Sequence, residues 1–150
     1  MGRVQVSVVI KAPVSNVWSY YTDIDKLQEW IPGGNIVKFE WLSPPPKRVG
    51  SRFRISHRAA GRVSTWIAEM IEMAKNKKGA YKLVEGDLKQ YEESFEFEPV
   101  NEETKVTCRM NYELPYPLLG KLLDILTVNK SVRADMQAML ERLKTNVEKL

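Results

Sequence analysis

The sequence is poor in the residues that build disulfides and metal sites. It contains one cysteine, Cys108, and one histidine, His57, among 150 residues. One cysteine excludes an intrachain disulfide and a thiolate zinc cluster, and one histidine excludes a histidine-rich metal site. No apolar run is long enough to cross a bilayer, and position 6 is Val where N-myristoylation of Gly2 would need Ser or Thr. We expect a cytoplasmic protein with no metal, no cofactor and no stable membrane insertion, although transient membrane contact is compatible with the sequence.

An excess of charge of one sign is also missing. Lys and Arg total 23 and Asp and Glu total 19, which leaves a net charge of +4. This falls short of the concentrated basic face of a nucleic-acid-binding protein, so we expect no nucleic-acid partner. The sequence has no phosphate-binding glycine loop and no nucleophile elbow. Its length and its 43% hydrophobic content fit one globular domain, residues 1–150.

The hydrophobic pattern predicts one strand, two short helices and then six more strands. Residues 4–10 alternate apolar and polar side chains, as a half-buried strand does. Pro13 opens a helix over residues 13–21, and Thr22 with Asp25 resembles a capping box for a second short helix that ends before Pro32. Turn residues then separate strand-length segments at 35–42, 51–58, 62–73, 80–85, 90–98 and 104–114.

The last element is predicted to be a long helix that runs from Pro117 almost to Leu150. From Val132 onward its apolar side chains fall within an arc of about 100°, the usual width of a core-facing stripe. Between Leu118 and Leu126 the arc widens to about 160°. These extra leucines either face a cavity or contact the two short helices. In both cases the helix must lie on the sheet, which makes the domain α+β.

Several segments resemble a known superfamily. Residues 11–18 (KAPVSNVW) and 23–30 (DIDKLQEW) resemble the opening signature of the START-like, birch-pollen-allergen-like (SRPBCC) superfamily. Residues 66–72, 112–115 and 140–144 are similar to its later landmarks, so the resemblance covers essentially the whole chain. It is closest to the polyketide cyclase/dehydrase and lipid-transport branch. The resemblance implies a helix-grip fold: a seven-stranded curved antiparallel sheet closed around the C-terminal helix, with a ligand-binding cavity between them.

Strand alternation predicts which side chains face this cavity. In segment 35–42 we place Val37, Phe39 and Trp41 inside, because Lys38 and Glu40 suit the solvent side. Segment 62–73 is ambiguous, since the set with Trp66 and the set with Ile67 are both apolar. An aromatic inner face is either plain core or a ligand wall, and the resemblance favours the wall. The predicted ligand-binding residues are Trp30, Phe39, Trp41, Phe53, Ile55, His57, Trp66, Met70, Tyr81, Leu83, Tyr91, Glu93, Phe95, Cys108, Met110, Tyr112, Leu118, Leu119, Leu122 and Leu126.

Two polar side chains, His57 and Glu93, are predicted on the inner face at the same end of the sheet, because consecutive strands run antiparallel. A buried carboxylate is costly unless it is paired or protonated. One interpretation places both residues at a solvated rim. The other lets them reach across one end of the cavity, where they would anchor a ligand's polar head or act as acid and base.

Three functions are compatible with the sequence, because members of the superfamily range from carriers to enzymes. The first is binding or transport of a small hydrophobic ligand, such as a lipid, a quinone or an aromatic polyketide-like compound. The second is a cyclase or dehydratase that uses His57 or Glu93. The third is a protein-interaction module that uses the apolar start of the long helix or a strip of arginines at positions 52, 54, 58 and 62. We place the carrier first and expect a monomer or a homodimer.

Overall fold

The computed structural model of the protein describes residues 2–59, 61–115 and 122–150. After β1 (Gly2–Ile10), the chain forms α1 (Val14–Thr22), a single 3-10 turn η1 (Ile24–Lys26) and α2 (Leu27–Trp30). The remaining elements are β2 (Ile36–Trp41), β3 (Arg52–Ala59), β4 (Arg62–Ala74), β5 (Lys78–Gly86), β6 (Gln90–Val100), β7 (Glu103–Glu113) and α3 (Leu122–Glu148). This order is the one predicted from the sequence.

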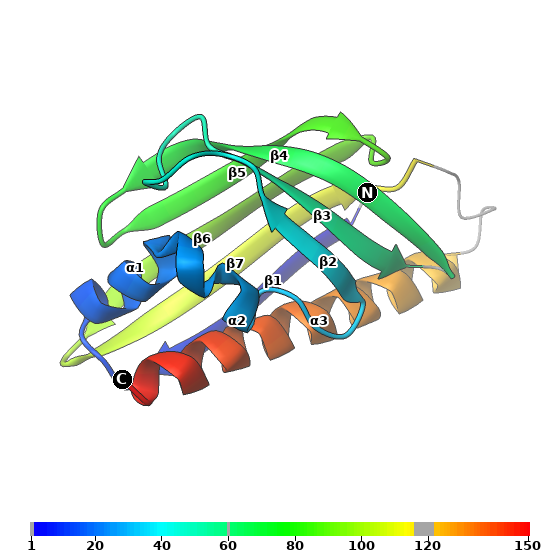
Figure 1. The fold of residues 1–150 in the computed structure, drawn as a ribbon. Helices are drawn as coiled ribbons and strands as arrows, with labels where there is room; N and C mark the ends of the chain where they lie inside the picture. The colour runs from blue at the N-terminus through cyan, green and yellow to red at the C-terminus, as the bar shows by residue number, and fades with distance from the viewer. Residues whose placement is uncertain (1, 60, 116–121) are drawn as a thin grey trace.

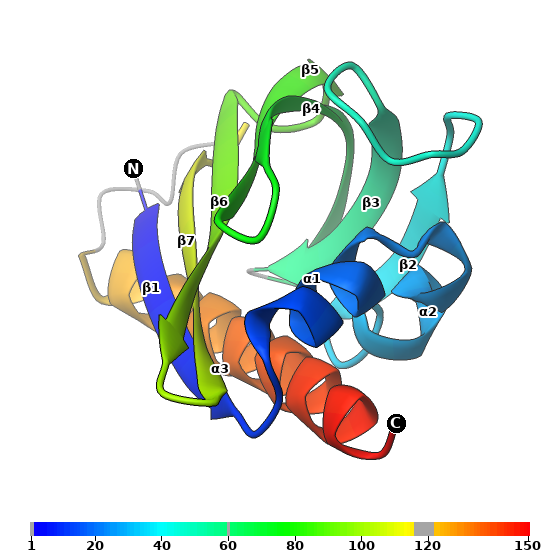
Figure 2. The same ribbon diagram turned by 90° about the vertical axis from the view of Figure 1, so that its left-hand side faces the viewer.

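The strands form one sheet in the order β1-β7-β6-β5-β4-β3-β2, and every neighbouring pair is antiparallel. The sheet is strongly curved, and α3 lies across its concave side (Figures 1 and 2). Although β1 and β2 are consecutive strands, they occupy opposite edges of the sheet. The segment with α1 and α2 therefore has to span the opening between the two edges (Figure 2). The predicted α+β helix-grip arrangement is confirmed.

The helix α3 is held by an apolar stripe that faces the sheet. Leu140 and Leu143 are completely buried, and Val128 is 5% exposed. Leu126 is 57% exposed, because two residues rotate the side chain by about 200° around the helix axis. The prediction that Leu126 lines the cavity is therefore wrong. Leu118, Leu119 and the side chain of Leu122 lie outside the described residues.

A β-bulge reverses the predicted direction of Val37. Ile36 pairs with His57, and Lys38 pairs with the next residue of β3, Ser56, so Val37 has no position of its own in the ladder. As a result Ile36 is 6% exposed and Val37 is 42% exposed. The prediction for Val37 is wrong.

The ambiguity in β4 is resolved in favour of the set that contains Trp66. Trp66, Ala68 and Met70 are buried, whereas Ile71 is 48% exposed. The tryptophan side of this strand therefore forms the concave face of the sheet.

The second helical segment is capped by Asp23 and not by Thr22. The Asp23 carboxylate accepts the backbone N–H of Asp25 at 3.0 Å. The Thr22 hydroxyl instead donates back to the carbonyl of Trp18 at 2.9 Å. A carboxylate can only accept hydrogen bonds, whereas a hydroxyl also donates to a preceding carbonyl, so the adjacent aspartate takes the capping role. The predicted capping box is one residue out of place.

The packing of α3 against the sheet gives a direct test of the fold. Leu140→Ala should lower the free energy of unfolding by about 2–5 kcal/mol, because it empties a fully buried position. Leu126→Ala is the matched control on the exposed side of the same helix and should cost less than about 0.5 kcal/mol. Urea denaturation measures both changes. Equal losses in the two variants would contradict this placement of the helix.

Candidate functional site

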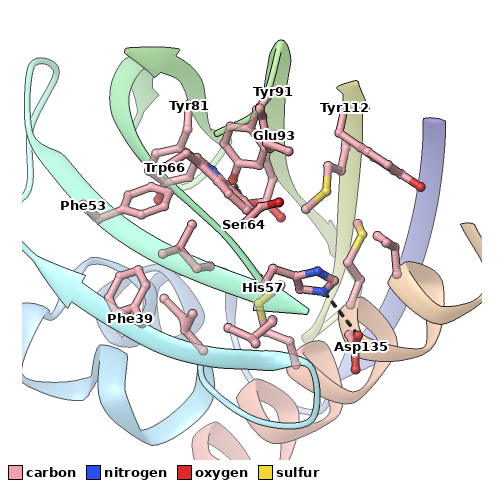
Figure 3. A pocket seen from close by; sticks show the side chains of 18 of the residues that line it. Phe39, Phe53, His57, Ser64, Trp66, Tyr81, Tyr91, Glu93, Tyr112 and Asp135 are labelled. Atoms are coloured by element: carbon pink, nitrogen blue, oxygen red, sulfur yellow. Dashed lines mark hydrogen bonds and ion pairs between the residues drawn. The ribbon is translucent and has the colours of Figure 1, made fainter. Parts of the chain in front are cut away.

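A cavity lies between the concave face of the sheet, α2 and α3. It leaves about 60 Å³ in which the centre of a water-sized molecule fits. One water needs about 10–15 Å³ on this measure, so the space holds several waters or a small organic group. A larger guest would have to displace side chains of the wall. Figure 3 shows aromatic side chains from several strands projecting into this common interior.

Most of the side chains predicted to bind a ligand line the cavity. Met70 and Cys108 do not, because both are completely buried and the protein's own atoms surround them. Leu83 also falls outside the lining, next to a register shift that pairs Ala68 with Leu83 and Ile67 with Glu85. The predicted residues that do line it are Trp30, Phe39, Trp41, Phe53, Ile55, His57, Trp66, Tyr81, Tyr91, Glu93, Phe95, Met110 and Tyr112. Ligand binding by these residues stays a prediction.

Other lining residues were missed. Val132, Met136 and Met139 belong to the predicted apolar stripe of α3, so the helical periodicity already pointed to them. Lys47 and Asp135 follow no such pattern, because neither a loop nor the polar edge of a helix has a periodicity that predicts burial. The remaining residues missed are Leu27, Ile31, Ile36, Ala59, Ser64, Leu88 and Leu114.

Lys47 enters the cavity from the loop between β2 and β3. The lysine is 5% exposed, whereas the rest of residues 44–50 are exposed. Its Nζ lies 3.8 Å from the centre of the Tyr21 ring, 5.4 Å from that of Tyr81 and 5.6 Å from that of Trp41. The same nitrogen donates to the backbone carbonyl of Tyr21 at 3.3 Å. Faces of aromatic rings attract a cation, so this aromatic cage stabilises the ammonium form.

No carboxylate of the described residues forms an ion pair with Lys47. Burial lowers the pKa of Lys47 to about 7, and the charge of Glu93 opposes this change. The amine therefore changes its charge close to neutral pH, unlike a lysine on the surface.

Glu93 is the second buried ionisable group of the cavity and projects from β6. Its carboxyl group accepts a hydrogen bond from the Tyr91 hydroxyl at 2.5 Å and another from the Cys108 thiol at 3.4 Å. Burial raises the pKa of Glu93, and these two hydrogen bonds together with the charge of Lys47 oppose the shift. Glu93 is 9% exposed, so the interpretation that places it at a solvated rim is wrong.

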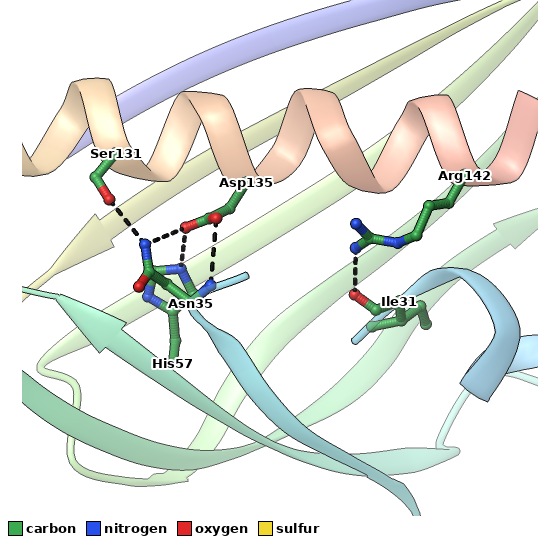
Figure 4. A network of polar contacts seen from close by, with 6 residues as sticks. All are labelled: Ile31, Asn35, His57, Ser131, Asp135 and Arg142. Atoms are coloured by element: carbon green, nitrogen blue, oxygen red, sulfur yellow. Dashed lines mark hydrogen bonds and ion pairs between the residues drawn. The ribbon is translucent and has the colours of Figure 1, made fainter. Parts of the chain in front are cut away.

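His57 is bonded to α3 and not to Glu93. Its Nε2–H donates to the Asp135 carboxylate at 3.2 Å (Figure 4). Burial lowers the pKa of His57, and the charge of Asp135 opposes this shift. The imidazole is therefore neutral at pH 7 and is oriented by the carboxylate. His57 and Glu93 both line the cavity, but each has its own partners, so the structure does not pair them.

The same carboxylate fastens the segment after α2 to α3. Asn35 donates to Asp135 through its backbone N–H at 3.3 Å and through its side chain at 3.1 Å. Arg142 donates to the carbonyl of Trp30 at 2.9 Å. It also donates to the carbonyl of Ile31 at 3.1 Å (Figure 4). Gly34 makes the tight approach possible, because its φ of +57° is unfavourable for other residues and a Cβ there would collide with Asp135.

Three tryptophans of the lining carry indole N–H groups without a protein acceptor in the described part of the chain: Trp30, Trp41 and Trp66. A buried donor without an acceptor is unfavourable by about 1–3 kcal/mol. The wall therefore contains donors that the described residues do not satisfy. Across the described residues, no group of three His, Cys, Asp or Glu side chains is placed to hold a metal ion.

Lys47 should make stability depend on pH. Its pKa falls from 10.5 to about 7 on folding, so between these values the unfolded state binds more protons and stability rises with pH. The slope is at most about 1.4 kcal/mol per pH unit. Lys47→Met should therefore be more stable than the wild type at pH 6, and this advantage should shrink towards pH 9. Urea denaturation at both pH values measures it.

The control for this prediction is Lys82→Met, which removes an exposed lysine from β5. Its stability difference from the wild type should be the same at both pH values. A pH-independent difference between Lys47→Met and the wild type would contradict the buried position of Lys47.

His57 can be followed directly by NMR, because it is the only histidine of the sequence. In the untagged protein its pKa should lie below 6.5, and in Asp135→Asn it should fall further, because the opposing carboxylate charge is lost. Glu141→Gln, on the exposed side of α3, should leave the titration unchanged. A pKa that stays constant or rises in Asp135→Asn would be inconsistent with this contact.

Several solved structures share this architecture. The protein TTHA0849 from Thermus thermophilus is 25% identical with a TM-score of 0.81, and the alignment covers 97% of this chain and 96% of that protein. A START superfamily protein from Mycobacterium smegmatis is 20% identical with a TM-score of 0.75 and 99% coverage of both chains. The Zhui aromatase/cyclase from Streptomyces sp. R1128 is 18% identical with a TM-score of 0.76, covering 98% of this chain and 93% of that one.

The sequence comparisons agree with the structural ones. No curated protein matches the chain by sequence. None of the helices within the described residues combines the length and apolarity needed to span a membrane. Residues 1–148 match the family described as polyketide cyclase / dehydrase and lipid transport. The predicted resemblance is thereby confirmed, and the chain belongs to this family.

Proposed function

We propose that the protein binds and carries a small, largely apolar molecule in the cavity between the sheet and α3. The observation that carries this proposal is the space itself. Protein interiors are normally packed as densely as organic crystals, with few voids larger than one water. Here about 60 Å³ remains in a cavity whose lining consists largely of residues of the buried apolar cluster.

The chemistry of the wall supports a hydrophobic guest. Trp66 packs against Tyr91 with 5.2 Å between ring centres, and Phe53 packs against Tyr81 at 5.1 Å. Such rings offer large apolar surfaces, and the methionines of α3 adapt to different shapes because their side chains are unbranched. A lipid, a quinone or an aromatic polyketide-like compound would suit this wall. The description of the family names two of these classes, polyketides and lipids.

The route into the cavity is proposed to run between α2 and α3. Trp30 lines the cavity, and its carbonyl is one of the groups that Arg142 holds. Entry of a guest would require this fastening to open, because it ties the segment after α2 to the helix. Polar bonds at such a place can break and reform without disturbing the packing of the sheet.

One observation favours a second candidate function, an enzyme of the cyclase or dehydratase type. A neutral His57 oriented by Asp135 has the arrangement of a general base, and it lines the cavity. One of the similar structures is named an aromatase/cyclase. Loss of turnover of a polyketide substrate in His57→Ala, with unchanged binding of that substrate, would favour the enzyme over the carrier.

Filling the cavity provides the test of the carrier proposal. Ile55 lines the cavity from β3, whereas the neighbouring Arg54 points to the other face of the strand. Ile55→Trp should weaken binding of 2-naphthamide at least about tenfold, since the indole takes the place of the guest, while Arg54→Trp should leave it unchanged. Isothermal titration calorimetry measures both affinities.

Stability is the second measurement on these variants. An extra ring forced into a filled core costs about 1–3 kcal/mol, whereas a ring that enters an open cavity costs less. Equal affinity in the two variants would refute binding at this place. Native mass spectrometry of protein purified from its own host would then show whether any ligand accompanies it.

A further inference from the structure

The buried amine of Lys47 has no anionic partner in its described surroundings. Removing an ammonium group from water is costly, and proteins usually offset this with a carboxylate. Here the offset comes from the face of Tyr21, at 3.8 Å, and from one backbone carbonyl. Lysine is also among the residues least often buried. Its position against the cavity therefore points to a role that involves whatever enters that space.

The titratable groups that face Lys47 are hydrogen-bonded to other side chains. Tyr21 from α1 and Tyr81 from β5 share a hydrogen bond of 2.7 Å, and burial raises the pKa of both, so they are neutral. Glu93 from β6 is engaged by Tyr91 and Cys108. Trp41 from β2 offers a ring and no charge. Within the described residues the ammonium is thus stabilised by rings and by a distant charge, and by no direct counterion.

The residues that line the cavity also include donors without an acceptor. The indole N–H groups of Trp30, Trp41 and Trp66 have no acceptor among the residues that the structure describes. A pure hydrocarbon would leave these N–H groups without an acceptor and the ammonium without an anion. A guest with a negatively charged oxygen would give the ammonium the counterion that the described residues do not supply.

We propose that Lys47 binds the carboxylate of the ligand, so that the cavity selects hydrophobic organic acids over neutral molecules of the same shape. This inference rests on the proposed function, because it names the class of molecule that the cavity carries. The apolar body of the acid would lie against the aromatic wall, and its carboxylate would lie beside Nζ. The ligand would supply the counterion that Lys47 lacks among the described residues.

A definite pH dependence follows. The bound carboxylate pairs with the protonated amine, and Lys47 in the free protein loses its proton around pH 7. Affinity for the acid should be roughly constant between about pH 5.5 and 6.5 and should then fall by up to about tenfold per pH unit. Affinity for a neutral amide of the same shape should not follow this curve.

The experiment compares matched pairs of probes by calorimetry: benzoate with benzamide, and 2-naphthoate with 2-naphthamide. In the wild type at pH 6 each acid should bind at least about tenfold more tightly than its amide. Lys47→Met should abolish this preference and still bind the amides, because the variant keeps the length and apolar character of the side chain. Lys82→Met removes the same charge from the exposed face of β5 and should keep the preference.

A second variant identifies the group that titrates. Glu93→Gln removes the other ionisable group that faces Lys47, and the fall in acid affinity above pH 7 should persist in it. A fall that disappears in Glu93→Gln would assign the titration to Glu93 and overturn the inference.

The remaining outcomes separate this inference from the proposed function. Equal affinities for acid and amide in the wild type, or a preference that survives in Lys47→Met, would overturn the role of Lys47 and leave the carrier intact. If the wild type binds none of the four probes, the carrier proposal fails, and the inference fails with it.

Discussion

The structure depends on a mismatch in size between one helix and a wide, curved sheet. The helix α3 packs along β1 and makes few contacts with the other strands. Because the sheet curves away from it, most of the concave face must be covered by other side chains. Large rings on β3 to β6, together with α1 and α2, cover much of this area. They do not fill it completely, and the remaining space is the cavity.

The general architecture could be predicted from the sequence because it follows from periodicity. Alternation along the strands placed Phe53, Tyr91 and Phe95 inside, and the helical stripe placed Leu140 against the sheet. Prediction was wrong where one residue breaks the period, as Val37 does at the bulge in β2. It was also wrong for Leu126, where an apolar side chain is simply exposed. Strand alternation and helical periodicity do not indicate where a bulge or an exposed apolar side chain departs from them.

The polar half of the site was harder to predict. His57 and Glu93 were placed on the correct face, but their partners were not foreseen, because the contact between His57 and Asp135 joins residues 78 positions apart. Lys47 was missed, since a lysine after a triple proline suggests an exposed loop. In the strip of arginines, Arg52 forms an ion pair with Glu69, and Arg54 forms one with Glu40. Part of the positive charge of the strip is therefore neutralised. The cytoplasmic location and the monomeric or dimeric state stay predictions.

Because Lys47 is carried by a loop, the charged group of the cavity belongs to a different part of the chain from the strands and helix that form its apolar wall. The strands and α3 determine the size and apolar character of the interior, and their side chains also form the buried core. The charged group is carried by residues 44–50, whose other members are exposed. On the role proposed for Lys47, exchange of this short segment would alter the chemical preference of the interior while the strands and α3 stay the same. On this role of Lys47, related proteins could acquire a different ligand preference through replacement of the loop between β2 and β3 alone.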